Sequence, residues 1–434
     1  MAAVRSQSGS RVAIIGTGYV GLTTAVCLAH LGHTVRAGDV DASKVEKLSA
    51  GIPTIVEEGL EELLRSELAT GRLSFVVGAS EAARSAEFVF LCVPTPMLPD
   101  GSADTSMIEA VANELSAVLE HDAIVVNKST VPVGSTGVVE RLLRRSDVSV
   151  VSNPEFLREG RALHDALHPD RIVVGADDQR AAARVGALFT KTKAPLIVTD
   201  AATAETIKYA SNAFLATKLS FVNSVACLCE VVSADVRDVL LGMAYDHRIG
   251  FDYMKPGPGW GGSCLPKDTR ALLNAAQQAG YDFELLAGVI EANERQGDRV
   301  LSKIRAAVGG SLDGRAVAVW GLTFKAGTDD RRDSPAVAIT KRLQSEGARV
   351  TAYDPTVRGE VAELPGVELT VDPYAACEGA NVLVVLTEWE ELRWLDFDKV
   401  RELLGAPCVV DTRNVLDPAA LRRLGFAYTG IGRP

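Results

Sequence analysis

The chain has 434 residues, of which 47% are hydrophobic and 23% are charged, and its formal net charge is −11. This length exceeds what one hydrophobic core accommodates, so we expect two or three domains. The acidic balance argues against a nucleic acid or an anionic membrane as the main partner, although it allows local basic pockets for phosphate groups.

Cysteine and histidine usage indicates a cytoplasmic protein without a bound metal. The seven cysteines are an odd number in a long chain and stand mostly among apolar residues, which favours reduced thiols over a disulfide framework. Cys227 and Cys229 have no second pair to complete a zinc site. His164 and His168 are four residues apart, but Pro169 ends the helix there and no third ligand follows at a useful spacing. The first residues are polar and no apolar stretch approaches ~18–20 residues, so we expect neither a signal peptide nor a membrane span.

The first part of the chain alternates apolar strands with helical segments such as Leu22–Leu31 and Met107–Leu119. Expected strands are Arg11–Ile15, Thr34–Asp39, Leu73–Val77, Phe88–Val93, Ala123–Asn127, Val148–Val151 and Arg171–Gly175. Continuous apolar strands separated by helices predict a parallel sheet that is covered on both faces.

The pattern changes near residue 200. Ala202–Ala234 has helical character and almost no glycine or proline, and a helix of that length usually bridges domains or forms an oligomer interface. Strand and helix then alternate again, with strands expected at Ala316–Trp320, Arg349–Tyr353, Val382–Leu386 and Cys408–Val410. We therefore predict an α/β protein of two doubly wound domains joined by a long central helix and a helical dimerisation segment.

Gly16, Gly18 and Gly21 form a G-x-G-x-x-G pattern that follows one expected strand and opens a helix. The first glycine allows a tight turn, the second lets a pyrophosphate approach the backbone, and the third lets helix and strand pack closely. Asp39 ends the next strand, where a carboxylate binds ribose hydroxyls and repels a 2′-phosphate. The pattern therefore predicts a dinucleotide site that prefers NAD to NADP, whereas a glycine turn without a ligand is the alternative.

Cys264 follows Gly261 and Gly262 in a glycine-rich loop and stands where a helix begins. Consecutive glycines would leave room for a substrate beside the backbone. Helix amides and Lys267 would lower the pKa of the thiol and favour a nucleophilic thiolate, with Asp268 close by. A buried structural cysteine is the alternative.

Two further pairs of polar residues are spaced by four. Lys208 and Asn212 share one face of the long helix and could hold a hydroxyl and the oxyanion it becomes, although a solvated face is the simpler explanation for such a pair. Glu155 and Glu159 could supply a general base and a ligand, or could be acidic residues at the start of a helix.

Six motifs together resemble the UDP-glucose/GDP-mannose dehydrogenase family from Arg11 to Ile431. They are Gly16–Gly21, Ser129–Gly134, Asn153–Gly160, Lys208–Asn212, Gly261–Asp268 and Gly321–Lys325. Pro169–Val173, Arg248–Gly250 and the serine before Cys264 resemble the branch that oxidises UDP-glucose. A dehydrogenase that acts on GDP-mannose or on another nucleotide sugar is the alternative within the family. A two-electron hydroxyacid dehydrogenase and a catalytically silent sugar-nucleotide sensor are alternatives outside it.

The resemblance implies a Rossmann-like NAD-binding domain at residues 1–200, a central helical dimerisation domain with the cysteine loop at 201–300, and a UDP-sugar-binding α/β domain at 301–434. It implies a cytoplasmic homodimer, or a higher homo-oligomer, that oxidises UDP-glucose to UDP-glucuronate with two NAD⁺. The hexose alcohol would become an aldehyde, a thiohemiacetal and then a thioester on Cys264, and water activated by Glu155 or Asp268 would release the acid.

The resemblance also implies a role for individual residues. The catalytic positions are Cys264, Lys208, Asn212, Asp268, Glu155 and Thr130. The NAD positions are Gly16, Gly18, Tyr19, Val20, Gly21, Asp39, Lys44, Thr95, Thr130, Glu159, Lys267 and Arg332. The substrate positions are Glu155, Phe156, Leu157, Arg158, Glu159, Lys208, Asn212, Arg248, Tyr253, Met254, Lys255, Pro256, Gly257, Gly261, Phe324, Lys325 and Arg413, with Arg248 reaching the substrate of the neighbouring subunit. Tyr253, Trp260 and Thr412 depart from the family pattern and are expected to change the volume of the pocket wall.

Overall fold

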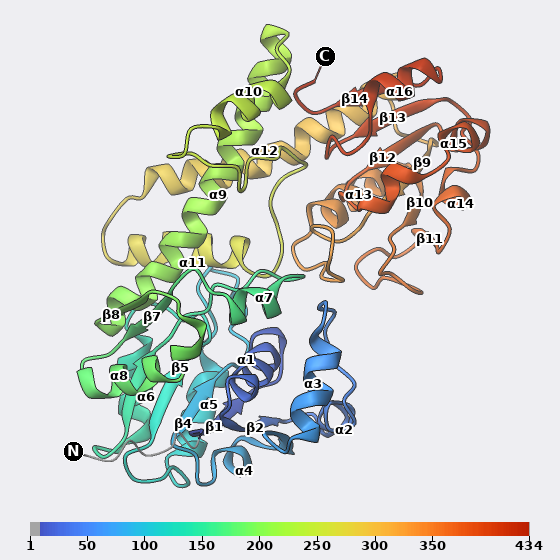
Figure 1. Cartoon of the computed structure of the whole chain (residues 1–434). Helices are drawn as coiled ribbons and strands as arrows, with labels where there is room; N and C mark the ends of the chain where they lie inside the picture. The colour runs from blue at the N-terminus through green and yellow to red at the C-terminus, as the bar shows by residue number, and fades with distance from the viewer. Residues whose placement is uncertain (1–8, 434) are drawn as a thin grey trace. The chain divides into compact units, whose positions relative to one another are not determined.

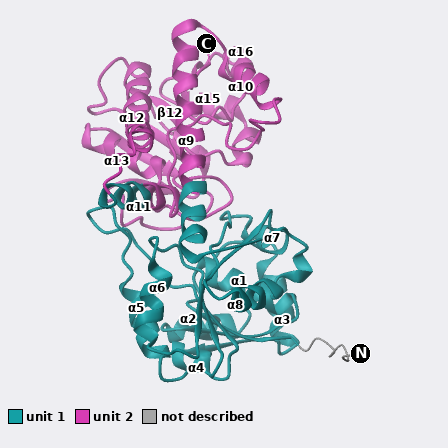
Figure 2. Cartoon of the chain, turned by 90° about the vertical axis from the view of Figure 1, so that its left-hand side faces the viewer, with its two compact units in different colours: residues 1–211, 270–279 teal, residues 212–269, 280–434 magenta. Residues whose placement is uncertain are grey.

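The computed structural model describes residues 9–433 and divides into two compact units. The N-terminal unit contains residues 1–211 and 270–279, and the C-terminal unit contains residues 212–269 and 280–434 (Figure 2). Two helices, α9 (Ala201–Val232) and α11 (Leu265–Gln278), contribute residues to both units. The division into three domains at residues 200 and 300 stays a prediction.

The N-terminal unit contains an eight-stranded sheet in the order β3-β2-β1-β4-β5-β6-β7-β8 (Figure 1). Its strands are β1 (Arg11–Ile15), β2 (Thr34–Asp39), β3 (Leu73–Val77), β4 (Phe88–Leu91), β5 (Ile124–Asn127), β6 (Ser149–Ser152), β7 (Ile172–Gly175) and β8 (Leu196–Thr199). Neighbouring strands are parallel except β6 and β7. The strand order reverses between β1 and β4, and the carboxyl ends of strands at such a point form the usual ligand crevice of this fold.

Helices cover both faces of this sheet because its central strands are buried on both sides. One face carries α1 (Tyr19–His30), α2 (Ala42–Ser49), α3 (Leu60–Ala69) and α8 (Gln179–Ala187). The other face carries α4 (Ala79–Ala83), α5 (Ser106–Leu115) and α6 (Ser135–Leu143). The short helix α7 (Ala162–Leu167) contacts α1. The strands predicted from apolar runs are therefore present and parallel, except that the one expected at Arg171–Gly175 is β7, which runs antiparallel to β6. Strand β8 at the sheet edge was missed because its residues are exposed.

The C-terminal unit repeats the same strand order in a six-stranded sheet, β11-β10-β9-β12-β13-β14, in which all pairs are parallel. Its strands are β9 (Ala316–Trp320), β10 (Arg349–Tyr353), β11 (Glu368–Thr370), β12 (Val382–Val385), β13 (Cys408–Asp411) and β14 (Ala427–Gly430). Helices α12 (Glu284–Ala307) and α13 (Pro335–Ser345) cover one face, and α14 (Pro373–Cys377), α15 (Phe397–Leu403) and α16 (Pro418–Arg423) cover the other. Two doubly wound sheets and a long helix confirm the predicted fold class.

Helix α9 has 32 residues, and its best window reaches a mean hydropathy of 1.5, which is long and apolar enough for a membrane span. The sequence analysis did not expect such a segment, because serine, threonine and asparagine interrupt its apolar residues. Val222, Ala226 and Cys229 on α9 belong to the buried core of the C-terminal unit, where α10 (Val236–Ala244) also packs. Helix α9 is therefore a core helix rather than a clear membrane span.

Candidate active site

The glycine turn after β1 has the geometry of a dinucleotide cradle. Gly16 has a φ of 92°, and a Cβ on Gly21 would lie 1.9 Å from the carbonyl oxygen of Gly16, so both positions require glycine. A Cβ on Gly18, in contrast, would meet no heavy atom within 4 Å. Gly18 precedes α1, so it leaves open space at a helix N-terminus, where a pyrophosphate fits.

Asp39 at the end of β2 lies next to this turn. Its Oδ2 accepts hydrogen bonds from the Thr17 amide (2.9 Å), the Thr17 hydroxyl (2.6 Å) and Lys44 Nζ (3.0 Å). Burial tends to raise the pKa of Asp39, but these bonds and one from the Asp41 amide lower it to about 2. The carboxylate is therefore ionised at neutral pH, and the residues of this turn fit a dinucleotide that carries a free 2′-hydroxyl.

The Tyr19 hydroxyl connects the cradle to the segment that ends at Gly160. It donates a hydrogen bond to Glu57 and accepts one from the Gly160 amide at 2.6 Å. Thr95 and Thr130, which the sequence placed together on the NAD side, are also in contact, because the Thr95 hydroxyl donates to the Thr130 carbonyl at 2.8 Å. Val20, two residues into α1, is half-buried.

Glu155 and Lys208 form a buried ion pair with 2.7 Å between Oε1 and Nζ. The other carboxylate oxygen of Glu155 accepts a hydrogen bond from the Leu157 amide at 2.7 Å. Burial opposes ionisation of Glu155, but the charge and hydrogen bond of Lys208 outweigh it, so the pKa of Glu155 is lowered. Lys208 Nζ also lies 5.6 Å from the centroid of the Phe156 ring, on which the Arg171 guanidinium stacks at 3.5 Å.

Arg158, which the sequence placed among the substrate ligands, forms a bidentate pair with Asp165 at 2.8 and 2.6 Å. The Arg158 amide donates to the same carboxylate at 3.0 Å. This pair ties the segment that contains Glu155 and Glu159 to α7. Arg158 therefore supports the conformation of the segment, and its contact with the substrate stays a prediction.

One supporting residue of this segment escaped the sequence analysis. Lys128 is buried at the end of β5, and its Nζ donates to Asn153 Oδ1 at 3.0 Å, while Asn153 Nδ2 donates to the Val173 carbonyl at 2.7 Å. Burial lowers the pKa of Lys128 to about 8. Lys128 lies directly before the Ser129–Gly134 motif, but its partner is 25 residues away, so the sequence alone gave no signal for this contact.

Cys264 is half-buried and lies directly before the first residue of α11. Its carbonyl accepts a hydrogen bond from the Asp268 amide at 2.9 Å, and its sulfur lies 3.6 Å from the Ser263 hydroxyl. Asp268 is fully buried and accepts hydrogen bonds from Asn212 Nδ2 at 2.6 Å and Lys267 Nζ at 2.5 Å. Cys264 therefore precedes a helix N-terminus, and the first turn of that helix carries Lys267 and Asp268, the latter hydrogen-bonded to Asn212.

The glycines before Cys264 do not leave the room that the sequence analysis expected. A Cβ on Gly261 would lie 2.1 Å from the Asp333 carbonyl oxygen, and a Cβ on Gly262 would lie 2.8 Å from the Phe324 ring. The room that the sequence analysis expected on the side-chain side of these two glycines is therefore filled by the chain itself, and a contact between Gly261 and the substrate stays a prediction. Both residues are glycine so that the cysteine loop can pack against the segment around Phe324.

The loop from Tyr253 to Gly257 is fixed from two sides. The Gly257 amide donates to Asn223 Oδ1, and the Gly257 carbonyl accepts from Gln296 Nε2, both at 2.8 Å. Met254 and Pro256 are buried and Lys255 is exposed. Tyr253 adopts a φ of 59°, and the sequence analysis recognised neither this backbone geometry nor the two amide side chains.

Trp260, which the sequence analysis expected in the pocket wall, is buried. Its indole Nε1 donates to Ser220 Oγ at 2.9 Å, and its amide donates to Asn293 Oδ1 at 2.8 Å. Thr412 is also fully buried, with its hydroxyl on the Val385 carbonyl at 2.7 Å. These two departures from the family pattern therefore change packing beneath the loops.

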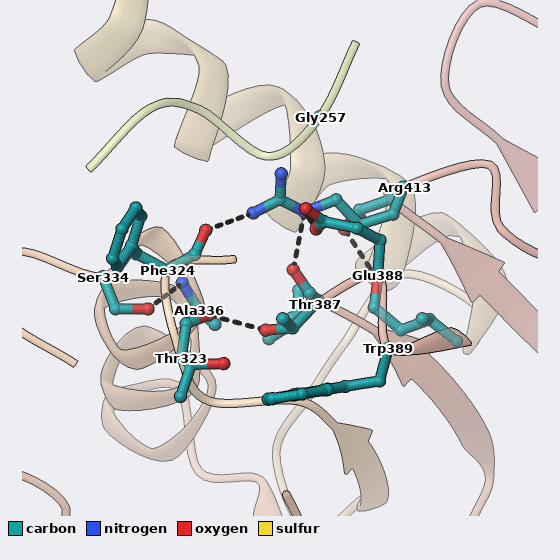
Figure 3. A network of polar contacts seen from close by, with 12 residues as sticks. Gly257, Thr323, Phe324, Ser334, Ala336, Thr387, Glu388, Trp389 and Arg413 are labelled. Carbon is teal, nitrogen blue, oxygen red and sulfur yellow. Dashed lines mark hydrogen bonds and ion pairs between the residues drawn. The ribbon is translucent and has the colours of Figure 1, made fainter. Parts of the chain in front are cut away.

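Arg413, Phe324 and Lys325 lie at the carboxyl edge of the second sheet. Arg413 donates from Nε to the Leu386 carbonyl at 2.9 Å and from Nη2 to the Phe324 carbonyl at 2.8 Å (Figure 3). Lys325 Nζ lies 5.5 Å from the centroid of the Phe324 ring. The structure thus brings together the three residues that the sequence assigned to the UDP-sugar in this part of the chain.

Arg248 and Arg332 are exposed and each forms an ion pair with a nearby aspartate. Arg248 pairs with Asp246 at 2.6 Å, and Arg332 pairs with Asp330 at 2.7 Å. The contact of Arg248 with a neighbouring subunit and the contact of Arg332 with NAD stay predictions.

Family models for three consecutive regions match the chain. They describe the NAD-binding domain (residues 10–193), the central domain (202–295) and the UDP-binding domain (318–418) of the UDP-glucose/GDP-mannose dehydrogenase family. UDP-glucose 6-dehydrogenases of Rhizobium meliloti and Pseudomonas aeruginosa are each 44% identical over 98% of this chain, and the alignments cover 100% and 98% of those proteins. The solved UDP-glucose dehydrogenase of Pyrobaculum islandicum is 38% identical, has a TM-score of 0.90, and both chains are covered over 100%. The chain therefore belongs to the UDP-glucose/GDP-mannose dehydrogenase family and is an NAD-dependent oxidoreductase.

Proposed function

We propose that the enzyme oxidises UDP-glucose to UDP-glucuronate through a thiohemiacetal and a thioester on Cys264. Three curated relatives that are 42–44% identical to this chain over nearly their full length carry the name UDP-glucose 6-dehydrogenase. The overall reaction consumes two NAD⁺ and one water for each sugar and releases two NADH. The observation that carries the thioester route is the half-buried Cys264 directly before a helix whose first turn holds Lys267 and the Asp268 carboxylate, to which Asn212 donates.

Lys208 and Asn212 stabilise negative charge on the hexose oxygen. They lie four residues apart on α9, so both side chains leave the same face of the helix. Donors that point at a developing oxyanion each contribute ~3–4 kcal/mol to transition-state stabilisation. The proton of the primary alcohol passes to a water held by Lys208 and Asp268. NAD⁺, bound at the turn from Gly16 to Gly21, supplies the hydride acceptor.

The Cys264 thiolate adds to the aldehyde carbon, so the reactive aldehyde stays on the enzyme. The resulting thiohemiacetal alkoxide is oxidised by loss of a hydride, which leaves a thioester. Attack by water breaks the C–S bond and returns the thiolate. Glu155 and Asp268 are the two candidate bases for that water, and the pairing with Lys208 keeps Glu155 ionised and able to accept a proton.

The UDP-sugar contacts the segments from Glu155 to Glu159, from Tyr253 to Gly257, and from Phe324 to Lys325, together with Arg413. Gly261 belongs to the same proposed site, although the position that a Cβ would take at this residue is occupied by the Asp333 carbonyl. We also propose that the enzyme is cytoplasmic. Its three domains in this proposal are residues 1–200, 201–300 and 301–434.

We infer a homodimer built on α9. Phe214, Phe221 and Leu228 are spaced by seven on this helix and are 68%, 56% and 58% exposed, and Val231 is 82% exposed. A stripe of this spacing on one face packs against an identical stripe of a second copy. In such a dimer we propose that Arg248, which is exposed and pairs with Asp246 within its own chain, contacts the substrate of the neighbouring subunit.

The test is the ratio of NADH formed to UDP-glucose consumed, measured by absorbance and by chromatography of the nucleotide sugars. Two NADH per sugar support the four-electron route, whereas one NADH per sugar would indicate a two-electron dehydrogenase and would refute it. Turnover of GDP-mannose under the same conditions separates the alternative within the family, because a GDP-mannose enzyme would prefer that substrate.

A further inference from the structure

A turn of three residues, Thr387, Glu388 and Trp389, follows β12 at the carboxyl edge of the second sheet (Figure 3). The strand order of this sheet reverses between β9 and β12, so the turn lies at the point where ligands bind in folds of this type. None of its residues has a role in the reaction described above.

Hydrogen bonds fix both ends of the turn. The Thr387 hydroxyl donates to the Thr323 carbonyl at 2.6 Å, and the Trp389 indole donates to Asp354 Oδ2 at 3.2 Å. Asp354 is 1% exposed and also accepts from the Leu322 amide at 2.8 Å. The direction of the side chain between them, Glu388, is therefore set by the fold.

Glu388 lies on the guanidinium of Arg413, with 3.1 Å between Oε2 and Nε. The Nε–H group already donates to the Leu386 carbonyl, so Glu388 contributes its charge to the contact and does not share the Nε proton. The side chain of Arg413 is 13% exposed and that of Glu388 is 33% exposed, so water screens the pair only in part.

The remaining edge of the Arg413 guanidinium faces Gly257 (Figure 3). A Cβ at position 257 would lie 3.1 Å from Nη1. Two carbonyls and one carboxylate thus hold the guanidinium plane, and its Nη1 edge is directed toward the Gly257 loop. Much of the attraction of a guanidinium for phosphate comes from charge. A carboxylate 3.1 Å from the same guanidinium repels a phosphate and offsets that attraction, whereas a hydrogen bond to a neutral hydroxyl oxygen depends less on net charge.

We propose that Glu388 is a positioning and specificity residue that orients Arg413 and balances its charge, so that Arg413 recognises hydroxyl groups of the sugar rather than the diphosphate. This inference rests on the proposed contact of Arg413 with the UDP-sugar. It adds the prediction that the carboxylate acts on the ligand only through Arg413.

Glu388→Gln is the primary variant, because it removes the charge while keeping the size of the side chain. The dissociation constants of UDP-glucose and of UDP are measured by calorimetry on the full-length protein. We expect UDP-glucose to bind about three- to fivefold more weakly, as for a partly exposed ion pair, and UDP to bind as tightly as before or more tightly. Glu390→Gln is the matched control, since it removes the same charge from an exposed position two residues away and should change neither constant.

A double-mutant cycle with Arg413→Ala tests separately whether Arg413 binds UDP-glucose and whether Glu388 acts through Arg413. If Arg413→Ala leaves the UDP-glucose constant unchanged, the assignment of Arg413 fails. If Arg413→Ala weakens UDP-glucose but Glu388→Gln behaves like Glu390→Gln, only the role of Glu388 fails. We expect Glu388→Gln to have no further effect in the Arg413→Ala background. An equal loss for UDP-glucose and UDP, with a lowered melting temperature, would show a purely structural role and would overturn the proposal. If Glu388→Gln does not fold, Glu388→Asp replaces it, because it keeps the charge but withdraws it from Arg413 by one methylene. UDP-glucose should then bind more weakly and UDP should not, and unchanged constants for both ligands would overturn the proposal.

Discussion

Removal of the Lys208 cation tests the buried ion pair on which both stability and chemistry depend. In Lys208→Met the Glu155 carboxylate remains buried without its 2.7 Å partner. Loss of one member of a buried pair typically costs ~3–5 kcal/mol. The charge of Lys128 still favours ionised Glu155, so we expect about 3 kcal/mol, at the low end of that range. For a unit of this size that corresponds to a fall in melting temperature of roughly 6–12 °C.

The pH dependence of this loss has a definite sign. Pairing lowers the pKa of Glu155 in the folded protein, so the pair stabilises the fold above the pKa of an unfolded glutamate, near ~4.3, and this contribution disappears as the pH falls through the lowered pKa. The deficit of Lys208→Met relative to the parent should therefore be largest at neutral pH and should shrink in acid. Thermal unfolding followed by circular dichroism between neutral and acidic pH measures it.

Two matched variants complete the test. Lys208→Met combined with Glu155→Gln should recover most of the stability at neutral pH, because the Glu155 carboxylate that lost its partner is removed as well, but should stay inactive. Lys44→Met removes a cation from Asp39 in a more exposed pair and should cost less than about 1 kcal/mol. A Lys208→Met protein as stable as the parent at neutral pH, or a double variant no more stable than the single one, would refute this reasoning.

Four other outcomes follow from the same contacts. Gly18→Ala should fold with an unchanged melting temperature but bind NAD at least tenfold more weakly, since its Cβ enters only the open space of the cradle. Gly21→Ala should instead unfold at lower temperature, because its Cβ would lie 1.9 Å from a backbone oxygen, and equal melting temperatures for the two variants would contradict this assignment. Asp39→Asn should narrow the preference for NAD over NADP, measured as the ratio of the two kcat/KM values. Phe221→Asp should lower the molar mass in light scattering from that of a dimer to that of a monomer, and an unchanged mass would exclude α9 from the interface.

The cradle and the strands could be predicted because their causes are local. Gly16, Gly18 and Gly21 solve a steric problem within six residues, and Asp39 follows at the end of the next strand. Runs such as β1 and β4 are apolar because both faces of their sheet are covered. In these segments the chain pattern alone determines the structure.

The supports of the site could not be predicted because their partners lie far apart in the sequence. Lys128 binds Asn153, and Glu388 pairs with Arg413, across 25 residues in each case. The two glycines Gly261 and Gly262 were predicted to leave room for substrate. The Asp333 carbonyl and the Phe324 ring, which come from a later segment, pack against them instead. A sequence shows which donors and acceptors are present, whereas pairing depends on the fold.

The central claim is a covalent acyl intermediate on Cys264. The most direct measurement is to mix the enzyme with UDP-glucose and excess NAD⁺, quench with acid during turnover, and determine the mass of the peptide that contains residue 264. The account predicts a UDP-glucuronyl adduct on this peptide, its absence in Cys264→Ala, and no formation of UDP-glucuronate by that variant. A Cys264→Ala enzyme that binds NAD and still forms UDP-glucuronate at near the parent rate would contradict it.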